Sequence, residues 1–85
     1  MFSKSVTINL SADAEARPVA VLVQIASKYE SRIYINQQNK RINAKSIMGM
    51  MSVGFAKGNQ MTIEAEGTDE KEAVEELANY VELGE

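Results

Sequence analysis

The spacing of the apolar residues constrains the fold of this chain more than any other feature, because it switches between two periods along the sequence. Near the N-terminus apolar residues occupy alternate positions, with one lysine among them: Phe2, Lys4, Val6, Ile8 and Leu10. Small polar residues fill the positions between them. A later segment repeats the alternation with Met61, Ile63 and Ala65. A period of two is typical of strands that bury one face, so we expect a strand at each place.

Two other segments carry a period near 3.6, which is typical of helices. In the first segment the apolar residues fall at i, i+3, i+4 and i+7: Val19, Leu22, Val23 and Ala26. Pro18 fits the first turn of this helix, which we expect to end near Lys28 or Tyr29. The last helix is predicted to start at Thr68 as N-cap. Its apolar face is formed by Val74, Leu77, Ala78 and Val81.

The middle of the chain combines both kinds of pattern. Residues 31–36 and 40–43 are separated by a short turn, and their composition predicts a β-hairpin. Residues 45–58 predict a short helix with Ser46 as its N-cap and Gly58 as its stop. The complete order is β-α-β-β-α-β-α, within one domain at 1–85. This order predicts an α+β fold of two layers, a four-stranded antiparallel sheet with three helices on one face.

The composition excludes several classes of function. The 85 residues include no cysteine and no histidine, so disulfides, thiolate nucleophiles, the usual catalytic triads and most transition-metal sites cannot form. The net charge of −3 lacks the basic excess of nucleic-acid binders. No apolar run approaches the roughly 20 residues that span a bilayer. We therefore expect a cytoplasmic protein that is not an enzyme, carries no cofactor or metal, and binds neither nucleic acid nor membranes directly.

Two short motifs resemble those of a known family. The segment "DAEARP" (13–18) is similar to the Gly-Leu-His-Ala-Arg-Pro hallmark of the HPr phosphocarrier proteins of the sugar phosphotransferase system. The segment "NAKSIMGMMSVGFAKG" (43–58) resembles their second hallmark almost throughout, and the closing "EGTDEKEAVEEL" is also similar. The resemblance covers essentially the whole chain. It implies an HPr-like open-faced sandwich, similar to that of a histidine-less catabolite-repression relative of HPr.

The resemblance fails at the residue that defines the family's chemistry. In HPr proteins the histidine of the first hallmark accepts a phosphoryl group from enzyme I, and here that position is Glu15. Asp13 and Ala14 also replace the family's Gly-Leu. Three interpretations of Glu15 stay open: a carboxylate that forms an acyl phosphate, a permanent charge that mimics phosphohistidine at a helix start, or a solvated residue left after the carrier role was lost.

Ser46 has two interpretations as well. From its place before an apolar run, it is an N-cap that stabilises a helix by about 1 kcal/mol. The resemblance implies a further role, because in related HPr proteins this serine is phosphorylated by HPr kinase/phosphorylase. The phosphorylated protein then binds a LacI-type catabolite control regulator. A phosphoserine adds a charge of about −1.5 to −2, which a helix start tolerates and a partner's basic side chains can bind.

The residues after Ser46 form an unusually methionine-rich segment. Met48, Met51, Ser52 and Phe55 share one predicted helix face, whereas Ile47, Met50 and Gly54 share another. Such a stripe fits either a core or a docking surface, because exposed methionines adapt to several partners. The resemblance implies a partner-binding surface, which we expect to include Arg17, Ala20, Ile47, Met48, Met51 and Phe55.

These observations predict a regulatory HPr-like protein of carbon catabolite control, with phosphorylation at Ser46 and a transcription regulator as its partner. An alternative is an unphosphorylated adaptor of the phosphotransferase system. Such an adaptor modulates transporters or metabolic enzymes, with Glu15 in the role of the phosphohistidine.

Overall fold

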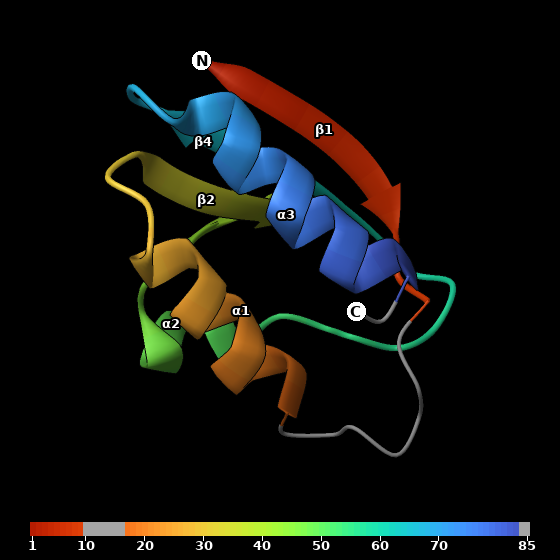
Figure 1. Cartoon of the computed structure of the whole chain (residues 1–85). Coiled ribbons are helices and arrows are strands. Elements are labelled where there is room, and N and C mark those ends of the chain that lie inside the picture. The colour runs from red at the N-terminus through yellow and green to blue at the C-terminus, as the bar shows by residue number, and fades with distance from the viewer. Residues whose placement is uncertain (10–16, 84–85) are drawn as a thin grey trace.

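The predicted order of elements is confirmed in a computed structural model, which describes residues 1–9 and 17–83, Arg17 and Pro18 by their backbone alone. The elements are β1 (Phe2–Thr7), α1 (Arg17–Ser27), β2 (Arg32–Gln37), β3 (Lys40–Asn43), α2 (Ile47–Met50), β4 (Gln60–Glu66) and α3 (Glu70–Leu83). Figure 1 shows the helices together on one side of the strands. The α+β fold of two layers is therefore confirmed.

The four strands form one antiparallel sheet in the order β1-β4-β2-β3. The central strand β4 aligns Met61 with Val6 of β1 and Ile63 with Ile35 of β2. The predicted alternation produces this arrangement, because every second side chain of β4 points to the same face. That face is buried at Met61, Ile63 and Ala65, whereas Thr62 and Glu64 between them are partly exposed.

The helices cover the apolar face of the sheet and form the second layer of the core. The predicted face of α1 is buried at Leu22, Val23 and Ala26, with Val19 partly buried against the core. The predicted face of α3 is buried at Val74, Leu77, Ala78 and Val81. Both 3.6-residue patterns thus identify the sides of the helices that are buried in the core.

The predicted helix over 45–58 is wrong in length. Helix α2 ends at Met50, and the chain turns away from the helical path before Gly54. The side chain of Gln37 makes two hydrogen bonds to the backbone of Gly54, each at 2.8 Å. Its Nε2 donates to the Gly54 carbonyl, and its Oε1 accepts from the Gly54 amide. This bond pair comes from β2, so a tertiary contact replaces the helical bonds that the local pattern favours.

Two predicted end signals act differently from what we expected. Gly58 is not a helix stop; it has a φ of 96° in a turn, and its amide donates to the Ile8 carbonyl at 2.9 Å. Ile8 is buried just beyond the end of β1, while Leu10 lies outside the described residues. Helix α3 begins at Glu70, two residues after Thr68, and the carboxylate of Glu70 accepts from the Gly67 amide at 3.2 Å.

Candidate functional site

Ser46 begins helix α2, as the sequence predicts. Its backbone is extended, with φ −103° and ψ 114°, and its Oγ accepts the amide hydrogen of Gly49 at 3.1 Å. The Ser46 carbonyl accepts the first helical bond, from Met50, at 2.9 Å. These are the features of an N-cap, in which the side chain satisfies an amide that the helix itself leaves free. The residue is half-buried.

The turn before Ser46 is fixed by short-range bonds. Asn43, the last residue of β3, accepts the Lys45 amide on its Oδ1 at 2.9 Å and the Ser46 amide on its carbonyl at 3.1 Å. Gly49 completes the arrangement, because a Cβ there would lie 3.3 Å from Ile42 Cγ2 and 3.4 Å from Ser46 Oγ. A side chain at this position would crowd the serine hydroxyl. The glycine therefore lets α2 sit close against the end of the sheet.

An exposed apolar surface surrounds this cap. The exposed fractions are 55% for Ile47, 85% for Met48 and 71% for Met51, whereas Met50 is fully buried. The core interpretation of the methionine segment is thus right for Met50 and wrong for Met48 and Met51. The prediction that Ile47 and Met50 lie on the same helix face is wrong, because Ile47 is exposed whereas Met50 is buried. We refer to Ile47, Met48 and Met51 as the α2 surface.

The other residues predicted to bind partners have different positions. Phe55 lies beyond the short α2 and packs, partly buried, against the core. Ala20 is exposed on α1. Arg17 is the first residue of α1, and Glu15 lies outside the described residues.

A chain of polar contacts joins the start of α2 to α1 and α3. The Lys45 ammonium donates to the Tyr29 carbonyl at 2.7 Å, and the Tyr29 hydroxyl donates to Glu76 on α3. Lys28 reaches the second oxygen of the same carboxylate at 2.7 Å. The bonds from Lys28 and Tyr29 lower the pKa of Glu76. Hydrogen bonding to Glu76, together with burial, raises the pKa of Tyr29 from its ordinary value of 10.0 to about 12.

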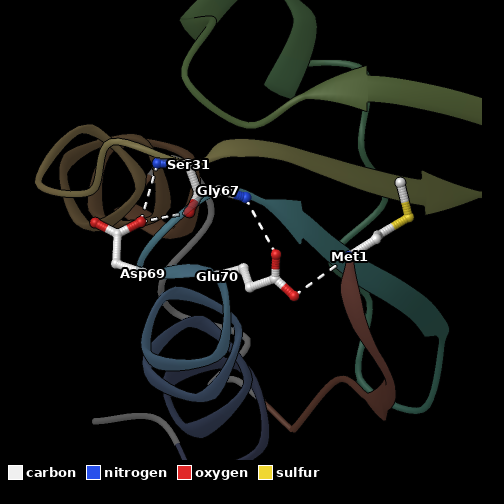
Figure 2. Close-up of polar contacts among 5 residues, drawn as sticks. All are labelled: Met1, Ser31, Gly67, Asp69 and Glu70. Carbon is white, nitrogen blue, oxygen red and sulfur yellow. Dashed lines mark hydrogen bonds and ion pairs between the residues drawn. The ribbon is translucent and has the colours of Figure 1, made fainter.

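A second polar junction, which the sequence analysis did not identify, ties the segment between α1 and β2 to the start of α3 (Figure 2). The Asp69 carboxylate accepts bonds from the Glu30 amide at 2.9 Å, from the Ser31 amide at 3.0 Å and from the Ser31 hydroxyl. The bond from the Ser31 hydroxyl is the main reason that the pKa of Asp69 is low. Glu70 meets the Met1 ammonium at 3.3 Å. The local sequence gives no signal for these contacts beyond an acidic helix start.

The part of the chain that the structure describes has no cluster of three or more residues able to hold a metal ion. Within the same residues, no helix is both long and apolar enough to cross a bilayer. The site that these residues form is a capped serine beside an exposed apolar surface.

Comparison with known proteins identifies the family. The model of the family described as "PTS HPr component phosphorylation site" matches residues 2–82. The chain belongs to the HPr family. It is 42% identical over 82 residues to the HPr-like protein Crh of Bacillus subtilis strain 168, covering 96% of each chain. It is 43% identical over 82 residues to the HPr-like protein Crh of Halalkalibacterium halodurans, covering 96% of this chain and 98% of that protein.

Solved structures of HPr proteins have the same fold. A phosphocarrier protein HPr from Bacillus anthracis has a TM-score of 0.88 at 43% identity, with 95% of this chain and 96% of that chain covered. The solution structure of Crh, the Bacillus subtilis catabolite repression HPr, has a TM-score of 0.70 at 41% identity, covering 95% and 96%. HPr proteins and their Crh relatives are phosphocarrier or regulatory proteins that interact with other proteins. This HPr-family chain is accordingly not an enzyme.

Proposed function

We propose that this HPr-family protein regulates carbon catabolite repression in the cytoplasm through phosphorylation at Ser46. In this proposal HPr kinase/phosphorylase modifies the serine, and the phosphorylated form binds a LacI-type regulator. The observation that carries the proposal is the position of Ser46, a half-exposed cap directly before the exposed α2 surface, in a chain without histidine. The similarity to Crh, a protein described by its link to catabolite repression, supports the same role.

The physical basis is a change of charge next to an apolar surface. A phosphate on Ser46 adds three acceptor oxygens and a charge of about −1.5 to −2, which a partner's arginine or lysine can bind. Ile47, Met48 and Met51 supply apolar contact area beside it, and methionine side chains adapt to the shape of a partner. We extend this docking surface to Ala20 and Arg17 on α1 and to Phe55. Phosphorylation then adds the charge that the partner recognises.

Two phosphorylation reactions test the proposal. The protein is incubated with enzyme I and phosphoenolpyruvate, and separately with HPr kinase/phosphorylase and ATP, and intact masses are measured. We expect no phosphoryl group from the first reaction and one from the second, absent in the Ser46→Ala variant. Phosphate gained from enzyme I would contradict the proposal and indicate an acyl phosphate on Glu15. No phosphate from either reaction would favour the adaptor, in which the Glu15 carboxylate mimics phosphohistidine.

A binding measurement tests the partner. The phosphorylated protein is titrated against a LacI-type regulator by calorimetry, with the unphosphorylated protein as reference. We expect binding only after phosphorylation. Met48→Ala and Met51→Ala should each weaken it by roughly 1–3 kcal/mol, as for central apolar contacts of an interface. Leu83→Ala is the matched control, because Leu83 is an exposed apolar residue of α3 outside the α2 surface. Equal effects at all three positions would argue against docking on α2.

A further inference from the structure

Lys45, which immediately precedes Ser46, points its side chain toward a different helix. Its ammonium lies 2.7 Å from the carbonyl oxygen of Tyr29, two residues beyond the end of α1, and the contact is partly buried. The side chains of these two neighbours have different partners. The serine hydroxyl caps α2, whereas the lysine reaches α1.

A cation at the end of α1 stabilises this helix. The C-terminus of a helix carries partial negative charge and free carbonyl groups, and a nearby ammonium stabilises both. Helix α1 has no basic residue in its last turn. Lys28 follows the helix, but its ammonium is bound to Glu76 at 2.7 Å. The stabilising charge therefore comes from Lys45, sixteen positions along the chain from Tyr29.

We propose that Lys45 is a switch residue that carries the charge state of Ser46 to helix α1. While Ser46 is unmodified, Lys45 holds the end of α1 through the Tyr29 carbonyl. When Ser46 is phosphorylated, the ammonium turns to the phosphate and releases that carbonyl. The release of the Tyr29 carbonyl on phosphorylation rests on the proposed modification of Ser46. The bond between Lys45 and Tyr29 in the unmodified protein does not.

The exchange of partners follows from charge. A bond between an ammonium and a phosphate is charged on both sides and stronger than a bond to a neutral carbonyl. The four-carbon stem of lysine is flexible enough to turn, and the two residues are neighbours in the chain. Helices α1 and α2 both carry residues of the proposed docking surface, Ala20 on one and Met48 on the other. Loss of the polar link between the helices would therefore change how that surface is held.

Amide hydrogen exchange tests the first half on the unmodified protein. The amides of Lys28 and Tyr29 bond the carbonyls of Ile25 and Ala26 at 3.1 and 3.2 Å, and they report on the end of α1. We expect Lys45→Met, which keeps the stem and removes the charge, to speed their exchange about tenfold. Lys45→Arg should restore much of the protection. Lys57→Met, at an exposed loop lysine, is the matched control and should leave both rates unchanged. Unchanged rates in Lys45→Met would overturn the proposal.

The second half uses protein with phosphoserine incorporated at position 46 during translation, so it does not depend on any kinase. We expect phosphorylation to speed exchange at Lys28 and Tyr29 about tenfold, with no further increase in Lys45→Met. Phosphorus NMR should show the second pKa of the phosphate lower in the wild type than in Lys45→Met. A phosphate pKa equal in both proteins, or an unchanged α1 end, would overturn the switch. Failure of the kinase to modify Ser46 would instead contradict only the proposed function.

Discussion

At the scale of single residues, Gly67 is the described glycine that has the least space for a side chain. A Cβ there would lie 2.6 Å from Ser31 Oγ and 2.7 Å from Ser31 Cα. Ser31 is itself fully buried and bound to Asp69, so it cannot move aside without breaking those bonds. The junction in Figure 2 therefore requires glycine for lack of space.

We expect Gly67→Ala to lower the free energy of unfolding by about 2–3 kcal/mol, because the added methyl group overpacks the contact with Ser31. Gly58→Ala is the matched control. Its φ of 96° disfavours a side chain, but a Cβ there has no atom within 4 Å, so a cost of about 1 kcal/mol is expected. Urea denaturation measures both values. A smaller loss of unfolding free energy for Gly67→Ala than for Gly58→Ala would show that the contact with Ser31 can rearrange to fit the added methyl group.

Asp69, at the same junction, should make stability depend on pH in the acid range. The folded structure lowers the pKa of this carboxyl from its ordinary value of 3.8, chiefly through the Ser31 hydroxyl. The unfolded chain therefore binds a proton more readily than the folded one, so stability rises with pH between the two values. The contribution is complete above the ordinary pKa and is lost as the pH falls through the folded one.

We expect Asp69→Asn to be less stable than the wild type at pH 7 and to lose less further stability between pH 5 and pH 2. Urea midpoints across this range provide the measurement. The variant also tests the junction, since an amide replaces an acceptor that binds three donors. Glu75→Gln, at an exposed acid on helix α3, which follows Asp69, is the control and should follow the wild-type curve. If the stability of Asp69→Asn falls between pH 5 and pH 2 as steeply as that of the wild type, the pH dependence comes from other carboxyl groups.

At the scale of elements, α2 separates its methionines sharply by exposure, with Met50 anchored in the core and Met48 and Met51 in solvent. Hydrogen peroxide oxidises accessible thioethers to sulfoxides. We expect Met48 and Met51 to be oxidised well before Met50 and before Met61 of β4, as peptide mass mapping would show. Met1, which is 66% exposed and lies outside α2, is the internal reference for an accessible thioether. Oxidation of Met50 as fast as Met51 would mean that α2 opens in solution.

The same helix shows where sequence patterns stop predicting structure. Ser46 is recognisable as a cap from its neighbours alone, because capping is a local interaction. The end of α2 is not, because Gln37 of β2 binds Gly54 from across the fold. The α2 surface shows the same limit: a helical wheel places Ile47 with Met50, yet a single turn of helix lets one be exposed and the other buried. Contacts such as Lys45 with Tyr29 have no local signal at all.

At the scale of the whole molecule, the alternation at Met61, Ile63 and Ala65 predicts a strand and its buried face. The order of elements, with the family resemblance, predicts the two layers. No local pattern predicts the strand order, in which β4 lies between β1 and β2. That order depends on how the helices cross the sheet, which is a property of the assembled core.

The strand order has a measurable consequence. Strand β4 is paired on both edges and covered by α3, whereas β1 and β3 each leave one edge of the sheet open. Amides that are bonded within the sheet and buried under a helix exchange only through large opening motions. In deuterated buffer we therefore expect the amides of β4 to exchange most slowly of the four strands, followed by β2, with β1 and β3 faster. Slower exchange in β1 than in β4 would contradict the central position of β4 and imply that β1 gains a second neighbour in solution.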